Sequence, residues 1–553
     1  MRRAALLLIV LALLVIPAAA QTPDATLPNG IASGDTTQTS TVLWTRTTAP
    51  GTVVFEISTD PTFAAVDQTL TAEAEDEWVP VKVEVENLTP ATEYAYRVTD
   101  SAGSMLSGRF VTAAEEGSIG LRFGVTGDWR GELAPFVAVR NAAEQNLDFF
   151  VLLGDTIYAD SPSPEVPAEQ ATTLDEFRRK HAEVYGWRHE ANYWADVRAS
   201  TSVFATIDDH EVTNDFAGGA PISSDERFSG DADTYINQSE LFQTGLQAFF
   251  EYNPLRDTVF ADTGDPRFDG RPDLYRYQTY GGDAAIIMLD AGLFRDPSVE
   301  GLTPIQALNG DRVASWTEEL WEPGRTMLGR PQVEALKRDL LAAHEAGITW
   351  KFIIVPEPVQ HQGWLGGNDR WEGYAPERTE VLQFIESNGI QNVVFIAADV
   401  HTTYVNNLTY ATEPNGPQTP IAAWEITTGS AAFDAPTGVQ LVEGAAQFGL
   451  FPRDEFEAYQ AASLAEQDAI LQALFNERIL IGQGFDPLGL EDSGIPFELI
   501  EGTWIAGHSY GWTMFEIAPE TQSLLVTTYG VPYYTVEQIA DGVHSMISLD
   551  GEG

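Results

Sequence analysis

Short segments of alternating apolar and polar residues occupy the N-terminal part of the chain, from Leu27 to Ala113, separated by Gly and Pro turns. Thr41–Arg46 and Val53–Ile57 are two such segments, and this alternation is typical of half-buried β-strands. The segment Leu88–Val98 has the spacing of a tyrosine corner, in which a Tyr hydroxyl bonds to nearby backbone of a β-sandwich. We therefore expect a small fibronectin-like all-β domain over residues 21–115.

A different pattern follows the linker at residues 114–118, because compact apolar runs are now separated by stretches with helical periodicity. This alternation is typical of an α/β layer fold, which we expect for residues 119–553. Two helices are predicted with their positions. The first is Gln332–Ala346, with leucines on one face and Gly347 as its stop, and the second is Glu455–Arg478.

The first twenty residues have the organisation of a signal peptide: two arginines, an apolar run from Ala4 to Ile16, and three alanines before Gln21. The run is shorter than the roughly 20 apolar residues that a spanning helix needs, and no later stretch approaches that length. We therefore expect cleavage near Gln21 and a secreted or periplasmic protein without a membrane span. The paired arginines leave the twin-arginine route open beside ordinary secretion.

The charge of the chain limits its partners. The formal net charge is −52 and only four residues are lysines, so the basic footprint of a protein that binds nucleic acid over a broad surface is missing. The chain has no cysteine, so disulfides do not stabilise it, and any metal is held by oxygen and imidazole ligands. These features leave the oligomeric state open.

Acidic residues and histidines follow the buried apolar runs of the α/β part. In open α/β sheets, ligands bind outside the carboxyl ends of the strands, so side chains from distant positions converge there. One Asp after a strand is often only a turn or a helix cap, but here six runs share the feature. The residues that end or follow these runs are Asp128, Asp155, Asp208, Asp209, His210, Asp290, Glu357, His361, Asp399 and His401.

Such an arrangement suits two-metal hydrolysis, in which carboxylates bridge two cations about 4 Å apart that activate a water and clamp phosphate oxygens. Asp155 suits the bridging position. Tyr158 adds a phenolate, a hard anionic ligand that favours a trivalent ion such as iron, and His401 completes the shell of that metal. The segment Gly154–Tyr158 is therefore the centre of the predicted site.

Five motifs follow one another along the α/β part. They are Gly154-Asp155-x-x-Tyr158, Asp208-Asp209-His210-Glu211-Val212-x-Asn214-Asp215, Met327-Leu328-Gly329-x-x-Gln332, Trp371-Glu372-Gly373-Tyr374-x-x-Glu377-Arg378 and Asp399-Val400-His401. In this order, and with the N-terminal sandwich, the chain resembles the PhoD-like alkaline phosphatases of the calcineurin-like metallophosphoesterase superfamily. The resemblance covers nearly the whole mature chain. It implies a metallophosphoesterase-type layered β-sandwich flanked by helices, preceded by the small all-β domain.

The activity that the resemblance implies is that of a secreted, metal-dependent phosphatase. A metal-bound hydroxide would hydrolyse phosphomonoesters, with phosphodiesters as a further substrate class, and the metals would neutralise substrate charge locally. His210 is the implied group to stabilise or protonate the leaving oxygen. The implied metal ligands are Asp155, Tyr158, Asn214, Asp399 and His401.

Two positions depart from the family pattern. Many relatives have a Cys near the first strand end as an iron ligand, whereas this chain has Asp128, as the purple acid phosphatases and the wider superfamily do. Ala398 stands where a Gly more often precedes the Asp. With a hard oxygen ligand in place of a thiolate, Fe³⁺ with Ca²⁺ is the expected pair, and Mn²⁺ and Zn²⁺ stay open. Asp209 competes with Asn214, the favoured residue, for the second metal, and His361 is a further candidate.

Two other classes of function fit parts of the sequence. A metal-independent secreted carboxylate-pair hydrolase, such as a glycosidase, would explain the many acids and would stay active after chelation. A noncatalytic protein that binds surfaces or carbohydrate would explain the β-sandwich and the 13 tryptophans, and it would turn over no phosphate ester. Both classes are kept as alternatives to the phosphatase.

Overall fold

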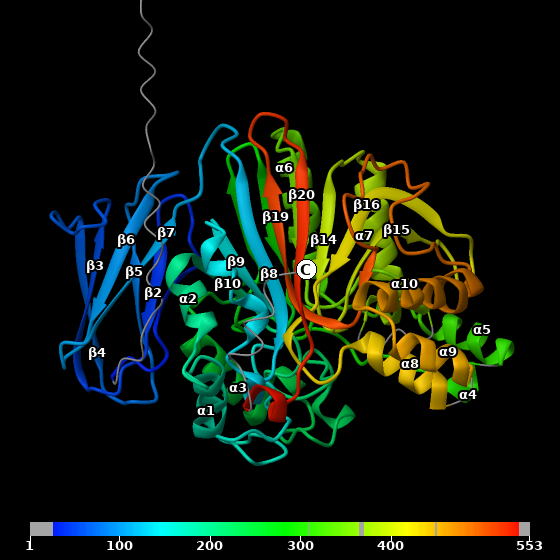
Figure 1. The fold of residues 1–553 in the computed structure, drawn as a ribbon, viewed down its shortest axis with the longest axis horizontal. Helices are drawn as coiled ribbons and strands as arrows, with labels where there is room; N and C mark the ends of the chain where they lie inside the picture. The colour runs from blue at the N-terminus through cyan, green and yellow to red at the C-terminus, as the bar shows by residue number, and fades with distance from the viewer. Residues whose placement is uncertain (1–25, 308, 364–369, 448–450, 541–553) are drawn as a thin grey trace, which may run out of the picture.

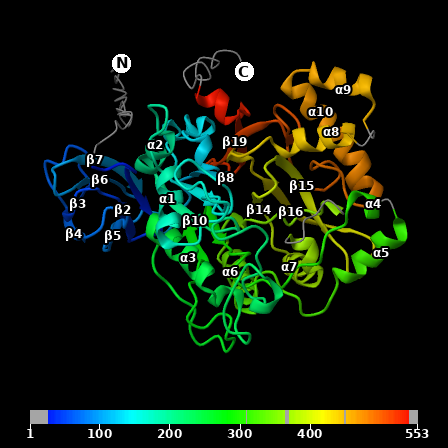
Figure 2. The ribbon, with the colours of Figure 1, turned by 90° about the horizontal axis from the view of Figure 1, so that it is seen from below.

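The computed structural model describes residues 26–307, 309–363, 370–447 and 451–540. Two large β-sheets face each other, and helices pack on the outer face of each sheet (Figure 1, Figure 2). The predicted α/β layered sandwich flanked by helices is therefore confirmed. The predicted signal peptide, residues 1–20, lies outside the described residues.

The first large sheet has nine strands in the described ranges and is parallel at its centre. Its order is β20 (Leu524–Pro532), β19 (Ser509–Ile517), β8 (Leu121–Trp129), β9 (Phe149–Leu153), β10 (Ser202–Thr206), β1 (Ile31–Gly34), β2 (Thr41–Thr45) and β5 (Val81–Val85), and β17 (Ser430–Ala432) pairs with β8. The neighbours β8, β9 and β10 run parallel. Every residue of β9 and β10 is buried, as expected of parallel strands covered on both faces.

The second large sheet has seven strands in the same ranges. Its order is β11 (Arg276–Tyr280), β12 (Ala284–Met288), β13 (Trp350–Ile354), β14 (Val393–Ala397), β16 (Thr419–Thr427), β15 (Thr403–Tyr410) and β18 (Ile505–Ala506). The strands β12, β13, β14 and β16 pair in parallel. The carboxyl ends of these strands therefore share one edge of this sheet as well.

Aromatic side chains fill the core between the two sheets. Phe123 stacks between Phe149 and Phe515, with ring centroids 4.7 and 4.8 Å apart. Phe352 of the seven-stranded sheet meets Phe123 edge-on at 5.0 Å. Such pairs add to the large apolar area that aromatic rings bury. This packing holds the inner faces of the sheets together, so that functional groups at the strand ends of both sheets come within reach of one another.

The helices lie in the connections between strands. They are α1 (Leu174–Val184), α2 (Tyr193–Ser200), α3 (Glu240–Tyr252), α4 (Pro304–Ala307), α5 (Gly310–Glu319), α6 (Arg330–Glu345), α7 (Ala375–Ser387), α8 (Thr437–Gln447), α9 (Arg453–Gln460) and α10 (Leu464–Leu474), with short helices at η1 (Gly131–Leu133), η2 (Val137–Val139), η3 (Ala142–Glu144), η4 (Ile222–Ser224), η5 (Ile236–Gln238), η7 (Trp371–Tyr374), η8 (Phe475–Leu480) and η9 (Ile481–Gln483). No helix within the described ranges is long and apolar enough to cross a membrane.

One of the two helix predictions needs correction. The helix predicted over Gln332–Ala346 is confirmed as α6. The prediction of one continuous helix over Glu455–Arg478 is wrong, because α9 ends at Gln460 and α10 begins after Ser463. The Ser463 side chain accepts a hydrogen bond from the backbone of Glu466, whose carboxylate bonds back to Ser463. This capping box starts a new helix.

The N-terminal strands form the predicted fibronectin-like sandwich. A four-stranded sheet, in the order β4 (Gln68–Ala74), β3 (Gly51–Ser58), β6 (Glu93–Thr99) and β7 (Met105–Val111), packs over β1, β2 and β5. The predicted tyrosine corner is present, because the backbone N–H of Thr89 donates to the Tyr94 hydroxyl at 2.9 Å. Since β1 also pairs with β10, one sheet of the sandwich continues into the nine-stranded sheet. The division into domains at residues 115–119 stays a prediction.

Candidate metal centre

Strand ends from both large sheets bring acidic side chains together at one edge of the core. Asp128 lies at the end of β8, Asp155 follows β9, and Asp208 and Asp209 follow β10. Asp399 follows β14 of the seven-stranded sheet. This is the place where α/β sheets bind ligands, because parallel strands end there together. The strand order of the sheets thus brings together side chains that are up to several hundred residues apart in the chain.

The backbone at these strand ends is bent into the left-handed region, which is uncommon for residues other than glycine and concentrates at functional sites. Gly154 has φ of 74°, and a Cβ there would lie 2.6 Å from Cβ of Asp208. Glycine at this position therefore lets the ends of β9 and β10 approach closely. The other residues with positive φ at this edge are Asp128 (59°), Asp155 (49°), Asp399 (60°) and His401 (51°).

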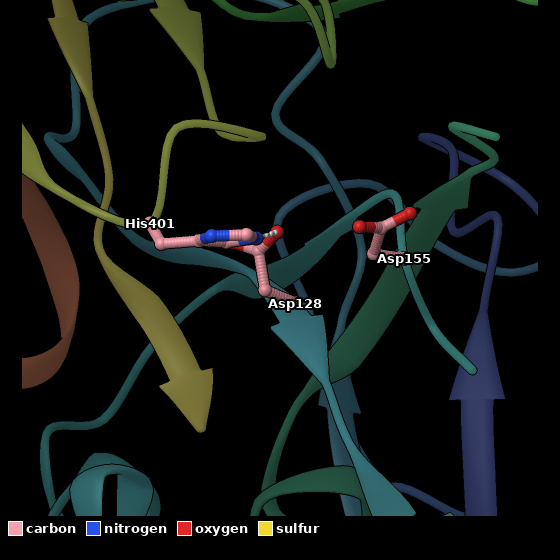
Figure 3. Close-up of side chains that lie close together, drawn as sticks. All are labelled: Asp128, Asp155 and His401. Carbon is pink, nitrogen blue, oxygen red and sulfur yellow. Dashed lines mark ion pairs between the residues drawn. The ribbon is translucent and has the colours of Figure 1, made fainter. Parts of the chain in front are cut away.

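The first group consists of Asp128, Asp155 and His401, which offer ligand atoms within 4.8 Å of one another. His401 reaches Asp128 from the loop after β14, with Nε2 3.3 Å from Asp128 Oδ1, and Asp155 stands on a separate loop (Figure 3). The Tyr158 hydroxyl lies between them, 2.7 Å from Asp155 Oδ2, 3.4 Å from Asp128 Oδ1 and 3.4 Å from His401 Nε2. The His401 ring stacks on Phe433 at 3.7 Å, which fixes its orientation.

The second group shares Asp155 and adds Asp209 and His210. His210 Nδ1 lies 2.6 Å from Asp160 Oδ1, so that bond orients the ring, and Nε2 lies 3.9 Å from Asp209 Oδ1. The backbone N–H of His210 donates to Asp155 Oδ1 at 3.3 Å. Asp155 therefore stands between two groups of donors, as the bridging position requires.

The third group joins Asp208 to Glu357 and Asp399. Two arginines border it: Arg370 Nε donates to Asp399 Oδ2 at 2.9 Å, and Arg295 contacts Glu357 Oε1 at 3.2 Å. The family resemblance implies that Asp399 and His401 are both metal ligands. In the structure these two side chains belong to neighbouring groups, with Val400 between them in the chain.

The electrostatics of the centre favour cations. Burial raises the pKa of Asp155 well above its usual range, and the nearby carboxylates of Asp209 and Asp128 raise it further. Burial and then Asp155 likewise raise the pKa of Tyr158 well above its usual range. Within the described part of the chain, Asp128 Oδ2 is buried and has no hydrogen-bond partner. Crowded buried carboxylates with spare lone pairs are unfavourable unless a positive charge joins them.

His210 carries such a positive charge. Burial lowers its pKa, but the charge of Asp209 and the bond to Asp160 outweigh burial, and the pKa rises to about 9. When no cation is bound at Asp209, the imidazole is therefore protonated at neutral pH. This is the protonation state that a general acid needs.

Glu211 accepts hydrogen bonds from two loops that carry residues of the centre. One of its oxygens accepts from both the backbone N–H and the hydroxyl of Thr156 at 2.6 Å, and the other accepts from the backbone N–H of Asp208 at 3.0 Å. The loop after β9 and the loop after β10 are thus tied to one buried carboxylate. Burial raises the pKa of Glu211 to about 7.

Three strand-end residues do not join the groups. The Asn214 side chain is exposed, and its backbone bonds to Asp160 and Arg227. The His361 ring stacks on Phe485 at 4.6 Å. Asp290 Oδ1 accepts from the backbone N–H groups of Gly292 and Leu293, which is a turn-capping role. The other predicted site residues do lie together: Asp128, Asp155, Tyr158, Asp209, His210, Asp399 and His401. Their roles as metal ligands or as general acid stay a prediction.

Sequence reasoning missed four participants. Asp160 lies two residues beyond Tyr158, and its only signal was an acid at a strand-end motif. Glu357 was noted at a strand end but was given no role. Arg295 and Arg370 had no signal, because their contacts with Glu357 and Asp399 depend on the tertiary structure.

Comparisons with known proteins agree with this architecture. The sequence model described as PhoD-like phosphatase matches residues 126–468, and the one described as PhoD-like phosphatase, N-terminal domain, matches residues 14–114. Alkaline phosphatase D of Bacillus subtilis (strain 168) is 28% identical over an alignment of 412 positions that covers 68% of this chain. The chain spans 65% of the length of that relative.

A solved structure titled "Structure of PhoD" has the same fold. It superposes with a TM-score of 0.61 at 20% sequence identity, over 93% of this chain and 94% of that one. The superposition extends over both the N-terminal sandwich and the two large sheets.

Proposed function

The chain belongs to the PhoD-like phosphatase family, and from this premise we propose that it is an exported, metal-dependent phosphoesterase. Its substrates are phosphomonoesters, and phosphodiesters form a second class. The similarity to alkaline phosphatase D over 68% of the chain supports the reaction type. The centre at the strand ends supports the metal dependence.

One observation carries the proposal: three groups of acids and histidines adjoin at a single edge, linked through Asp155 and through the segment Asp399–His401. Burial and then the neighbouring carboxylates raise the pKa of Asp155, and Asp128 has a buried oxygen without a partner in the described ranges. A folded protein tolerates such a crowd at a functional site when cations join it. The residues present therefore fit metal ions.

The donors suit hard cations. Asp128, Asp155, Tyr158 and His401 would hold one ion, with Asp155 and Asp209 directed at a second. Carboxylate, phenolate and imidazole donors without sulfur agree with Fe³⁺ and Ca²⁺, and Mn²⁺ or Zn²⁺ have compatible donor sets. When bound, the ions polarise phosphoryl oxygens and acidify water.

The protein's own groups handle the proton and the orientation. Asp160 orients the His210 ring through Nδ1 at 2.6 Å, so Nε2 is the nitrogen left to donate a proton to the oxygen of the departing alcohol. Arg370, bonded to Asp399, places a guanidinium beside the centre, where it orients a phosphate ester. These local cations let a chain of net charge −52 bind an anionic substrate.

Export is part of the proposal. The predicted signal peptide and the absence of cysteine fit a secreted or periplasmic protein that does not depend on disulfides. A mature N-terminus near Gln21, determined by mass spectrometry of the protein recovered from outside the cytoplasm, supports export. A chain with an intact Met1 that is found in the cytoplasm alone contradicts it.

Hydrolysis assays test the reaction. Purified protein supplied with Fe, Ca, Mn or Zn salts is given an aryl phosphomonoester, a bis-aryl phosphodiester and an aryl glycoside. We expect release of the aryl alcohol from the phosphate esters and not from the glycoside. Asp155→Asn is expected to lower kcat/KM about a thousandfold or more.

Asp290→Asn is the matched control, because Asp290 is also a buried acid at a strand end but caps a turn, which Asn can also do. This variant should keep most of the activity. Hydrolysis of the glycoside alone, or equal activity of Asp155→Asn and the parent protein, contradicts the proposed function.

A further inference from the structure

A cavity of about 130 Å³ lies beside the candidate metal centre. Its apolar wall comes from the helices that follow the centre in the chain, with Leu441 of α8, Leu471 of α10, Phe475 of η8 and Ile505 of β18. Leu471, Phe475 and Ile505 are at most 5% exposed. The wall is therefore built for an apolar group.

The cavity adjoins the centre through the loop after β14. Asp399 and His401 take part in the candidate metal groups, and Val400 between them lines the cavity. Arg370, another lining residue, donates to Asp399 Oδ2 at 2.9 Å and to Gln362 Oε1 at 3.0 Å. Arg370 thus lies both at the cavity and against a carboxylate of the candidate metal centre.

The polar groups around the cavity are paired within the protein or enclosed by it. Gln362 Nε2 donates to the Tyr404 hydroxyl, and Arg370 donates to Gln362 Oε1 at 3.0 Å. The Thr437 hydroxyl donates to the backbone carbonyl of Val400, and the Thr402 hydroxyl is enclosed by protein. The apolar wall is therefore the surface that the cavity offers to a bound group.

We propose that this cavity, called the ester pocket below, holds the organic group of a phosphate ester whose phosphorus lies at the metal centre; this inference rests on the proposed function. The substrate class is an ester of a compact, mostly apolar, ring-sized alcohol. An apolar cavity of about 150 Å³ is known to take benzene, so the ester pocket is of the right size for one ring. The apolar wall holds the ring.

Variants that fill the ester pocket test the inference. Leu441 is half-buried, so Leu441→Trp and the smaller change Leu441→Phe extend a ring into the pocket. We expect the ratio of kcat/KM for phenyl phosphate to that for methyl phosphate to fall on the order of tenfold or more with Trp, and less with Phe. Comparing ratios removes the difference in intrinsic reactivity between the two esters.

Leu464→Trp is the control, because Leu464 is 41% exposed on α10 and does not line the pocket. This variant should keep the ratio of the parent protein. If Leu441→Trp and Leu441→Phe fold, as judged by the same thermal midpoint as the control, and also keep the ratio, the inference is overturned.

Binding separates this inference from the proposed function, because phosphonates are not hydrolysed. Calorimetry with metal-loaded protein should show phenylphosphonate binding about tenfold or more tightly than methylphosphonate, and Leu441→Trp should remove the difference. Tight phenylphosphonate binding without turnover of any ester contradicts the function but retains the ester pocket. Turnover with equal binding of both phosphonates retains the function and overturns the pocket.

Discussion

At the scale of single residues, the candidate metal centre contains some residues that could be predicted from the sequence and some that could not. Asp128, Asp155 and His401 were predicted because the end of a buried apolar run is a local pattern that can be read in the sequence. Asp160 and Arg370 were not, because each is defined by the side chain it meets in space, at His210 and Asp399. Candidate ligands can therefore be predicted from the ends of strands in the sequence. The residues that orient them can be found only in the folded structure.

The choice between Asp209 and Asn214 is a direct test at this scale. Asp209 lies with Asp155 in a candidate group, whereas the Asn214 side chain is exposed. We expect Asp209→Asn to lower kcat/KM for an aryl phosphate about a hundredfold or more, because a charged metal ligand is lost, and Asn214→Ala to lower it far less. Steady-state kinetics with saturating metal measures both. A larger loss with Asn214→Ala would restore the preference for Asn214 that the sequence suggested.

His181 gives the fold a pH dependence. It is fully buried in α1, its ring stacks on Tyr252 at 5.4 Å, and neither ring nitrogen has a hydrogen-bond partner in the described ranges. Burial, with Arg198 as a smaller cause, lowers the pKa of His181 to about 3. The folded state therefore stays neutral here, while the unfolded state binds a proton below its ordinary pKa of about 6.5.

We therefore expect His181→Phe to stabilise the protein increasingly as the pH falls. Above about pH 6.5, His181 is neutral in both states and does not lower the free energy of unfolding. From there toward pH 3 only the unfolded state binds the proton, so the free energy of unfolding falls by about 1.4 kcal/mol per pH unit. The difference between variant and parent in free energy of unfolding should grow by about 2 kcal/mol from pH 8 to pH 5. Urea denaturation at both pH values measures it. A constant difference would mean that His181 is protonated in the folded state.

At the scale of elements, local patterns predicted types better than boundaries. The helix over Gln332–Ala346 was found because its apolar face and its Gly347 stop are continuous in sequence. The break before Ser463 was missed although Ser463 and Glu466 have the spacing of a capping box, because the helical periodicity seemed to run through it. The tyrosine corner at Tyr94 was predictable because its two partners, Thr89 and Tyr94, are only 5 residues apart in the sequence.

The helix α7 holds a neighbouring loop through one carboxylate. Glu377 is 5% exposed and accepts from the backbone N–H groups of Met327 and Leu328 at 3.0 and 2.9 Å, and from the Thr326 hydroxyl. We expect Glu377→Gln to lower the free energy of unfolding by about 2 kcal/mol or more, because buried donors lose a charged acceptor. Thermal and urea unfolding check this.

Glu380 on the same helix is the matched control. Its side chain is 37% exposed and pairs with Arg330 and Lys337 at 2.7 and 2.8 Å. Exposed ion pairs contribute little, so Glu380→Gln should cost less than about 1 kcal/mol. Equal losses at the two positions would contradict the structural role given to Glu377.

At the scale of the whole molecule, the sequence predicted the layers but not how they join. Strands such as β2 and β3 could be recognised from their own residues, and the resemblance supplied the sandwich. The parallel pairing of β1 with β10 was not predictable, because Ser33 and Ser202 are paired across a long stretch of chain that leaves no local signal. This pairing makes the N-terminal strands part of the nine-stranded sheet.

The shared sheet predicts cooperative unfolding. Polar contacts also cross the junction, since Arg276 forms an ion pair with the Asp35 carboxylate at 3.2 Å and the backbone N–H of Arg256 donates to the same carboxylate at 2.8 Å. Calorimetry should show one transition for the N-terminal sandwich and the two large sheets, and a chain that lacks residues 26–115 should aggregate, because the edge of β10 and its apolar cover are exposed. Two well-separated transitions, or a soluble and active truncated chain, would show independent parts.

The central claim is that the acids at the strand ends hold metal ions on which phosphate ester hydrolysis depends. The most direct measurement is the metal content of the purified protein together with its aryl phosphate hydrolysis before chelation, after chelation and after metal is restored. The account predicts about two or more ions per chain, a loss of activity of about a hundredfold or more on removal, and recovery on re-addition. Metal-free protein that hydrolyses the ester at an undiminished rate would contradict it.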